Sequence, residues 1–451
     1  MLLFAVLLTA HLRHSGVLWE GEVLPLAVAL QMKRGAVLYR DAWFDKPPLV
    51  PVIYLLWGAA IGPVLRAAGA VYALIASLFA WRIGAQLWSE REGLLAAALL
   101  AFFLTFDIHS GVLPLTADLL LLVPHLAAVL FALRRQPFRS GLAAGIGFLF
   151  NAKAVLVLAA CAVFVWPGIV LLLAGFALPN LIALGWLAGA GALPSYIDQV
   201  WRWPARYAAS PVVDDPVLNG TVRTLNWLGF HAAAAIGAAV FWYRERRWKF
   251  IVWAALCYAG VVLGWRFFPR YFFLLLPALI IAASRGLMLC GRRVRFAVLL
   301  LLLIPLVRFA PRYIDLRNWS DLALDEDSRA ASRIVLADAP PGSTLYVWGY
   351  RPEIYVYTRL KPATKYLECQ ALTGVPADRH LSQSTVVLTT GTHEAREELA
   401  RSAPDVLVDG LSPFNPSLSM RNYPELRPWL AQYREVARTR GSVVYLRSTM
   451  R

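Results

Sequence analysis

The sequence predicts a mainly α, polytopic membrane protein that ends in a soluble α/β domain. Apolar residues make up 59% of the 451 residues and charged residues only 16%, whereas soluble domains usually carry about 25% charged residues. The mean hydropathy of +0.56 agrees with this balance and excludes a soluble globular enzyme. Apolar runs fill the chain to about Pro311, and charged residues return beyond it. We therefore expect a transmembrane domain over residues 1–311 and an extracytoplasmic domain over residues 312–451.

The formal net charge is +16, and much of the basic charge lies in short clusters between apolar runs. A membrane protein fixes its orientation with such clusters, so the lipid bilayer, and not nucleic acid, is the expected partner. The four cysteines are far apart in the sequence and suggest neither a metal motif nor a disulfide framework. The sequence indicates no cofactor and no metal ligands, and it leaves a divalent metal open.

About eleven transmembrane helices are expected, because a span needs about 20 apolar residues. The first segment, residues 1–13, covers only roughly 20 Å at about 1.5 Å per residue. It lacks the basic n-region of a signal peptide, so we expect a mis-assigned start codon that shortens the first helix. The other predicted spans lie near residues 64–86, 93–108, 116–133, 140–153, 154–167, 168–190, 226–243, 249–267, 270–284 and 296–311.

Four turns between these spans carry clusters of basic residues and are expected on the cytoplasmic side. The sides assigned to successive turns are then consistent only if residues 46–62 do not cross the membrane. These residues would lie along the outer face as an interfacial helix. The first external loop and the C-terminal domain would both face the periplasm or exterior. The four basic turns include Arg82 and Arg91, residues 134–139, residues 244–249 and residues 285–295.

The C-terminal region alternates short apolar runs with helical patterns, which predicts a small α/β domain. Trp348 and Tyr350, with Tyr355 and Tyr357, would either stack on a sugar or pack as core, and packing is the simpler interpretation. The expected strands are residues 345–350, 385–390, 406–410 and 443–446, and the expected helices are residues 393–403 and 424–439.

Three acids stand where spans are expected to meet the outer face. Glu20 and Glu22 lie where the first helix should leave the membrane, and Asp118 begins a later span. Carboxylates at this depth are costly and indicate function by default. The alternatives are solvated interface acids for the two glutamates and a helix N-terminal acid for Asp118.

Cations gather on the same expected face. Lys46 precedes two prolines, Lys153 lies between two apolar runs, and Arg266 and Arg270 follow another span. A lysine that snorkels at a helix start is ordinary, but three clusters on one face suggest an anion site. Transfer of a sugar from a lipid phosphate needs cations for the leaving phosphate and a carboxylate base for the acceptor.

These segments resemble the GT-C glycosyltransferases of the aminoarabinose-transferase and protein O-mannosyltransferase type. Glu20 and Glu22 resemble the acidic motif after the first helix of that family, and Lys46-Pro47-Pro48 resembles its Lys-Pro-Pro motif, which opens an interfacial helix. Further similarity lies in residues 115–118, in residues 267–272 with 276–278, and in residues 347–355.

The resemblance implies a bacterial inner-membrane enzyme that is multi-pass, inverting and dependent on a polyprenyl-phosphate sugar. It implies Glu20 or Glu22 as the base with Asp118 assisting. Gly21 separates the two glutamates where the family usually has an adjacent pair, so the base remains open, and counting forward to Ala27 favours Glu22. Lys46, Arg270 and Tyr271 would bind the donor phosphate, with Arg266 and Lys153 as further outer-face cations.

Two other functions remain as alternatives. A transporter or flippase of lipid-linked sugars would be expected to show two matching halves with broken helices, and we see no such symmetry in the sequence. An oligosaccharide polymerase or ligase would share the lipid donor but lack the Lys-Pro-Pro helix. Nothing in the sequence identifies the sugar, a hexose or a pentose, or the acceptor, which could be a lipid, a glycan or a protein.

Overall fold

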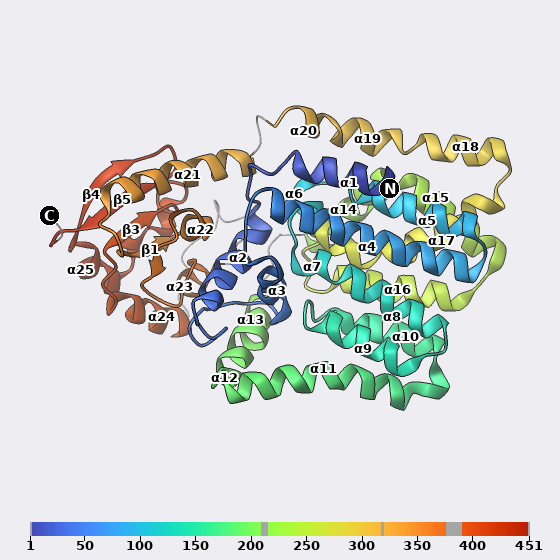
Figure 1. Cartoon of the computed structure of the whole chain (residues 1–451), viewed down its shortest axis with the longest axis horizontal. Helices are drawn as coiled ribbons and strands as arrows, with labels where there is room; N and C mark the ends of the chain where they lie inside the picture. Colours follow the sequence, from blue (N-terminus) through green and yellow to red (C-terminus); the bar gives the residue numbers. More distant parts are fainter. Residues whose placement is uncertain (1, 209–214, 317–319, 376–389, 450–451) are drawn as a thin grey trace.

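A computed structural model describes residues 2–208, 215–316, 320–375 and 390–449. Figure 1 shows a body of packed helices beside a smaller C-terminal unit that contains the sheet. The helices of the body are α1 Leu2–Leu12, α2 Glu20–Lys33, α3 Leu49–Val52, α4 Pro63–Leu87, α5 Glu90–Phe103, α6 His109–Val112, α7 Ala117–Leu120, α8 Leu122–Leu133, α9 Pro137–Phe148, α10 Ala154–Phe164, α11 Ile169–Gly189, α12 Leu193–Tyr196, α13 Trp203–Ala208, α14 Pro216–Phe230, α15 Ala232–Glu245, α16 Trp248–Val262, α17 Leu276–Leu289, α18 Arg292–Leu300, α19 Leu303–Phe309 and α20 Pro311–Ile314.

Local sequence explains several helix starts. Pro63 occupies the first turn of α4, where its missing N–H costs nothing. The Ser89 side chain caps α5 by accepting a hydrogen bond from the Arg91 backbone N–H. Acids in the first turn of α5 interact favourably with the helix dipole. Short non-α turns join the longer helices: the 3-10 segments Ile53–Trp57, Trp166–Gly168 and Pro269–Leu274, and the π-helical segment Ile197–Arg202.

Glycines let several helices of the body pack closely. A Cβ atom on Gly141 of α9 would lie 1.9 Å from the Leu172 carbonyl oxygen of α11, and one on Gly286 of α17 would lie 1.7 Å from the Gly237 carbonyl oxygen of α15. Small residues at such crossings are typical of helix packing in membranes.

The predicted count of eleven spans is not confirmed. Within the described residues, three helices are long and apolar enough to cross a membrane, namely Pro63–Leu87, Trp166–Gly189 and Arg292–Ile314. The bent pair α14–α15 would make a fourth, and further apolar helices of 10–17 residues are shorter than a span. Breaks account for much of the difference: the predicted span 116–133, for example, is divided between α7 and α8.

The span predicted near residues 226–243 contains a sharp break. The chain turns by 93° between α14 and α15. His231 stands at the break, where its ring stacks on Trp227 and its Nδ1 lies 2.9 Å from the Trp227 carbonyl oxygen. That carbonyl also accepts a hydrogen bond from the His231 backbone, which helps to close α14 at this point.

The predicted interfacial helix over residues 46–62 is much shorter in the structure. It consists of α3 and the 3-10 segment Ile53–Trp57, with Pro48 as the residue before the first turn. Gly58 then adopts a left-handed conformation and ends the segment.

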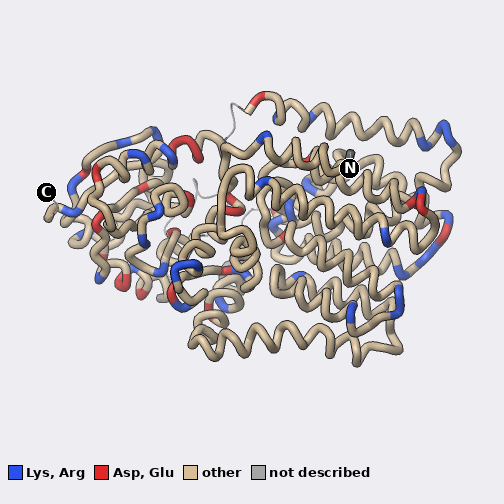
Figure 2. The backbone as a smooth tube through the Cα atoms, in the orientation of Figure 1, with Lys and Arg blue, Asp and Glu red and all other residues tan. Residues whose placement is uncertain are grey.

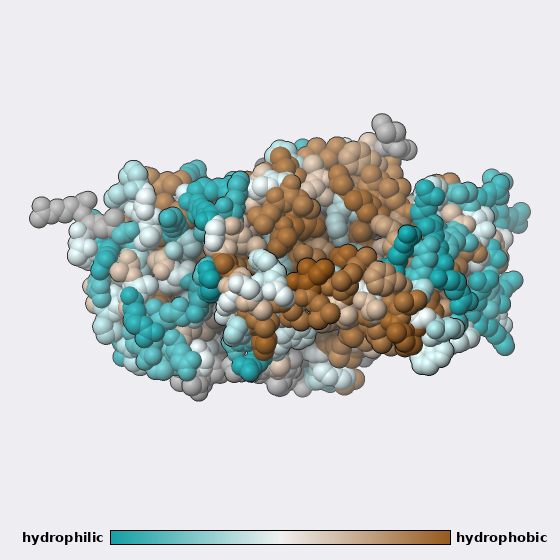
Figure 3. Space-filling model, turned by 60° about the horizontal axis from the view of Figure 1, so that its bottom comes forward, coloured by the Kyte–Doolittle hydropathy of each residue, from teal (hydrophilic) through white to brown (hydrophobic). Residues whose placement is uncertain are grey.

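The surface of the body divides into zones. Figure 3 shows a broad hydrophobic region over the helical body, flanked by hydrophilic surface at both ends of the molecule. Large apolar side chains on α11, among them Val170 and Ile182, are exposed there. Figure 2 shows basic segments at the end of the body remote from the C-terminal unit. The turns α15–α16 and α17–α18 lie at this end.

The C-terminal unit is built on a five-stranded sheet of order β2-β1-β3-β5-β4. Strands β2, β1 and β3 are parallel, whereas β5 pairs antiparallel with β3 and β4. The strands are β1 Thr344–Trp348, β2 Lys361–Pro362, β3 Val406–Asp409, β4 Tyr433–Arg438 and β5 Val443–Arg447, and the α-helices are α21 Ser320–Asp338, α22 Glu353–Thr358, α23 Gln370–Thr373, α24 Thr390–Ala400 and α25 Arg427–Leu430.

The predicted strands near residues 345–350, 406–410 and 443–446 are confirmed as β1, β3 and β5, and the helix near 393–403 as α24. The strand expected at residues 385–390 lies largely outside the described residues. The helix expected over residues 424–439 is wrong, because its second half is the strand β4. β4 pairs with β5 at the edge of the sheet, so cross-strand hydrogen bonds override its helix-compatible pattern.

The segment between α1 and α3 joins the C-terminal unit to the body. The Trp43 N–H donates to the Lys365 carbonyl at 2.9 Å, and the Arg34 guanidinium donates to the Arg359 carbonyl at 2.6 Å. Nearby, Arg329 of α21 donates to the Gly16 carbonyl at 2.7 Å. These bonds hold the C-terminal unit against the segment between α1 and α3.

Candidate functional site

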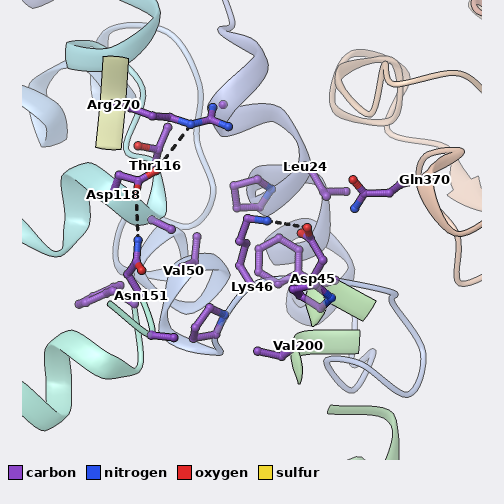
Figure 4. Close-up of a pocket in the computed structure, with 18 of the residues that line it drawn as sticks. Leu24, Asp45, Lys46, Val50, Thr116, Asp118, Asn151, Val200, Arg270 and Gln370 are labelled. Carbon is purple, nitrogen blue, oxygen red and sulfur yellow. Dashed lines mark hydrogen bonds and ion pairs between the residues drawn. The ribbon is translucent and has the colours of Figure 1, made fainter. Parts of the chain in front are cut away.

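A cavity of about 350 Å³ lies where the body meets the C-terminal unit. Figure 4 shows Arg270, Asp118 and Asn151 toward one side of it, Lys46 and Asp45 in the middle, and Gln370 on the opposite side. Its walls come from the start of α2, the loop before α3, the start of α7, the turn before α10, the segment around α13, the 3-10 segment Pro269–Leu274 and loops of the C-terminal unit.

Three cations from three elements line this cavity, and all three were predicted as phosphate ligands or outer-face cations. Lys46 precedes α3, Lys153 is the residue before α10, and Arg270 lies in the 3-10 segment Pro269–Leu274. Residues 107 to 224 positions apart in the sequence thus converge on one space. Tyr271, the other predicted phosphate ligand, also lines the cavity.

Asp118 lies between two of these cations. Its Oδ2 is 3.5 Å from Arg270 Nε, its Oδ1 is 3.9 Å from Lys153 Nζ, and Oδ1 accepts a hydrogen bond from Asn151 at 3.0 Å. The Thr116 hydroxyl caps the short helix α7 that carries Asp118. A carboxylate so surrounded is well placed to orient the cations.

The Lys153 ammonium group can still donate hydrogen bonds to a ligand. Its Nζ lies 3.2 Å from the centre of the Tyr271 ring, and it makes no hydrogen bond with any described residue. Burial lowers the pKa of Lys153 to about 8, with Asp118 opposing this shift and Arg270 and Lys46 adding to it. An anion in the cavity would supply the missing hydrogen-bond acceptor.

Lys46 Nζ is paired with Oδ2 of its neighbour, Asp45, at 2.5 Å, and the Lys46 side chain is 47% exposed. Burial disfavours the charged form of Lys46, but the Asp45 carboxylate outweighs this effect and raises the pKa of Lys46. Lys46 therefore stays cationic at neutral pH.

A buried amide holds the Lys46 loop in place. Gln199, in the π-helical segment Ile197–Arg202, accepts a hydrogen bond from the Phe44 N–H at 2.9 Å and donates to the Tyr39 carbonyl at 2.8 Å. The Tyr39 hydroxyl in turn donates to the Lys46 carbonyl at 2.8 Å. Sequence patterns could not predict this bridge, because its partners are about 155 residues apart.

The two predicted acids of α2 face different surroundings. Glu20, the first residue of the helix, is exposed and lines the cavity. Glu22 is fully buried and is not among the lining residues. Two positions along the same helix therefore separate an acid that borders the cavity from an acid in the interior.

Glu22 is paired with Arg66 of α4. Arg66 donates to both carboxylate oxygens, and the Trp19 N–H donates to Oε1 at 3.0 Å. Arg66 also donates to the carbonyl oxygens of Val17 and Leu113. The pair joins the start of α2 to α4 and to the loop before α7. Its contacts therefore indicate a role in holding the fold together.

The C-terminal unit contributes lining residues, of which Glu368 and Gln370 were not singled out from the sequence. Glu368, Gln370, Tyr350 and Pro352 all border the cavity. Burial above all, together with Asp45 and Glu20 and against Lys46, raises the pKa of Glu368 to about 8. Glu368 is not part of a local motif, so the fold alone reveals it.

The remaining candidates lie outside the cavity lining. Arg266 is buried near Tyr271 but does not border the cavity. Trp348 and Tyr355 are buried and bonded within the C-terminal unit, through Leu418 and Val347 respectively, which agrees with packing for these two. No group of three or more potential metal ligands is found among the described residues.

Comparison with solved structures places this architecture. The chain matches ArnT from Cupriavidus metallidurans bound to undecaprenyl phosphate with a TM-score of 0.58 and 15% identity, over 98% of this chain and 97% of that one. The apo state of ArnT matches with a TM-score of 0.59 and 14% identity, over the same shares. The apo oligosaccharyltransferase from Archaeoglobus fulgidus matches with a TM-score of 0.49 and 12% identity, over 91% of this chain and 69% of that one. No family model and no curated protein sequence matches the chain.

The helical body with its C-terminal sheet is therefore a GT-C fold, the fold of a class of integral-membrane glycosyltransferases. The chain shares this fold with ArnT, the aminoarabinose transferase, over nearly the whole of both chains. This confirms the expected GT-C architecture, apart from the number of spans.

Proposed function

We propose that the protein is a glycosyltransferase that moves a sugar from a polyprenyl-phosphate donor to a lipid, glycan or protein acceptor. The observation that carries the proposal is the convergence of Lys46, Lys153 and Arg270 on a cavity that also contains carboxylates. The ArnT structure with undecaprenyl phosphate, which has the same fold, supports a lipid-phosphate donor.

The cations would bind the donor phosphate and hold the charge that it gains when the glycosidic bond breaks. Lys153 and Arg270 are linked through Asp118, and Lys46 stands nearer the middle of the cavity. Fixed cations aimed at a developing charge lower the barrier without reorganisation during the reaction. A phosphate so stabilised leaves without needing an acid to protonate it.

The reaction would be a single displacement that inverts the anomeric carbon. The acceptor hydroxyl or amine attacks that carbon, the bond from the carbon to the phosphate oxygen breaks, and its electron pair stays on the phosphate. A carboxylate takes the proton of the acceptor.

Glu20 is the better candidate for this base than Glu22, which the sequence favoured. Glu20 borders the cavity, whereas the Glu22 carboxylate is enclosed with Arg66 and has no path to an acceptor. Asp118 is engaged with the cations and would position them.

The same proposal places the cavity and the C-terminal unit on the periplasmic side of a bacterial inner membrane. Basic segments lie at the opposite end of the helical body, and the positive-inside rule assigns such an end to the cytoplasm. The hydrophobic region between the two ends supports a membrane position for the body.

The test is sugar transfer by the purified protein in lipid nanodiscs that contain a radiolabelled polyprenyl-phosphate sugar. Lys46→Ala and Arg270→Ala should each reduce transfer and weaken donor binding, because each removes a cation from the phosphate. Arg401→Ala, on the exposed surface beyond α24, is the matched control for loss of a cation. Wild-type transfer by both cavity variants would contradict the phosphate site.

A further inference from the structure

Glu368 has unusual surroundings for a carboxylate. It is 5% exposed, it borders the cavity, and it makes no hydrogen bond or ion pair with any residue that the structure describes. Its carboxyl oxygens are not among the fully enclosed polar atoms, so they are open to the cavity that the residue borders. Such a group at the edge of a cavity indicates a ligand that supplies the missing bond.

The backbone around Glu368 is held firmly. The next residue, Cys369, donates its N–H to the Gly349 carbonyl at 3.1 Å, and the Gly349 N–H donates to Cys369 Sγ at 2.8 Å. Cys369 is also the residue before α23. The carboxylate is therefore presented to the cavity by a fixed segment of the C-terminal unit.

The charged groups divide the cavity into two ends. Lys153 and Arg270 gather around Asp118 at one end. Glu368 interacts electrostatically with Glu20, Asp45 and Lys46. Lys46 lies between the two ends, because it also interacts with Lys153 and Arg270. Figure 4 shows Arg270 and Asp118 on the side opposite Gln370, the neighbour of Glu368 two residues along the chain.

We propose that Glu368 binds a hydroxyl group of the donor sugar, so that the body holds the phosphate and the C-terminal unit recognises the sugar. This inference rests on the proposed function. A phosphate held by Lys153, Arg270 and the central Lys46 leaves the attached sugar to extend toward Glu20 and Glu368. The raised pKa of Glu368 supports this role, because a carboxyl that keeps its proton at neutral pH can both donate and accept a hydrogen bond.

The test compares binding of two ligands, a polyprenyl-phosphate sugar and the same polyprenyl phosphate without a sugar. Glu368→Leu should weaken binding of the sugar-bearing lipid about tenfold or more, as expected for a lost hydrogen bond in a buried site. It should leave binding of the bare lipid phosphate within about twofold of wild type. Glu368→Gln, which keeps a donor and an acceptor, should stay near wild type for both lipids.

A set of donors that each lack one hydroxyl identifies the bonded group. One deoxy donor should bind wild type less tightly and lose nothing further in Glu368→Leu, since the bond is already missing. Glu435→Ala, an exposed acid on β4, is the control in the same unit. It should leave both affinities unchanged.

Three outcomes would overturn the inference. Equal weakening of both lipids by Glu368→Leu would show a structural role. An effect on the KM for the acceptor alone would place Glu368 in the acceptor site. Additive losses for every deoxy donor would show that no sugar hydroxyl meets this residue. Failure of wild type to bind either lipid would instead contradict the proposed function itself.

Discussion

Glu20 and Glu22 stand two residues apart, yet the structure gives them opposite environments. Glu20 borders the cavity, and Glu22 pairs with Arg66 in the interior. Sequence reasoning identified the acidic motif but could not separate its members, because the partner of Glu22 is 44 residues away and carries no motif of its own. The burial of the Glu22–Arg66 pair follows from the packing of α2 against α4 and not from the local sequence.

The two glutamates therefore predict two different losses. Glu20→Gln should lower turnover by about 10²–10⁴-fold, the usual effect of a lost general base, while the thermal midpoint stays near wild type. Glu22→Gln should destabilise the protein by about 3–5 kcal/mol, because Arg66 would remain buried without its counter-charge. Transfer assays and thermal unfolding in detergent check both expectations. A stable but inactive Glu22→Gln with an active Glu20→Gln would return the base to Glu22.

Lys153 predicts an alkaline limit on donor capture. With its pKa lowered to about 8, it is cationic below that pH and neutral above it. The value of kcat/KM for the donor, which reports ionisations of the free enzyme, should fall as the pH rises through about 8. Lys153→Arg should remove this fall, because a guanidinium stays charged.

The control for this profile is Glu368→Gln, since the pKa of Glu368 is also raised to about 8. This variant should keep the alkaline fall if Lys153 causes it. The same fall in Lys153→Arg would show that another group controls the limit.

At the scale of elements, Gly21 determines how closely α2 approaches the Asp118 segment. A Cβ atom at this position would lie 2.6 Å from Thr116 Cγ2. Gly21→Ala should push the start of α2 away from α7 and reduce transfer, although alanine is the better helix former. The double variant Gly21→Ala/Thr116→Ser should restore activity, because serine lacks the clashing methyl group and keeps the hydroxyl that caps α7.

Gly185→Ala is the matched control, since a Cβ atom there meets nothing within 4 Å in α11. Transfer activity and thermal midpoint of the four proteins decide the matter. Full activity of the Gly21→Ala single variant would show that this close approach is not required.

Sequence patterns predicted some of these elements and failed for others. Hydrophobicity and turn residues predicted β1, β3 and β5, because each is a short apolar strand inside the sheet. They failed for β4, an edge strand whose charged residues suit either structure. They also failed for the 93° break between α14 and α15, where the His231 ring stacks on Trp227. Lys46 and Arg270 were found from local motifs, whereas Glu368 and Gln199 reach the site only through tertiary contacts.

At the scale of the whole molecule, the arrangement predicts opposite accessibility for its two ends. In a Cys290→Ser background, Arg401→Cys beyond α24 should react with a membrane-impermeant thiol reagent in intact spheroplasts. Arg293→Cys in α18, at the basic end, should react only after permeabilisation. Both side chains are exposed in the structure. Reversed labelling would place the C-terminal unit in the cytoplasm and contradict the proposed orientation.

Cleavage of the bond between sugar and lipid phosphate in the cavity would be revealed by the fate of a doubly labelled donor. Purified protein in proteoliposomes would receive a donor labelled in both the sugar and the lipid, with membrane extract as the source of acceptors. In the wild-type reaction, we expect the sugar label to leave the lipid with inversion at the anomeric carbon. In Glu20→Gln and Lys153→Ala, we expect the sugar label to stay on the lipid. A donor that crosses the bilayer with both labels still joined would instead identify a transporter and exclude the proposed transfer reaction.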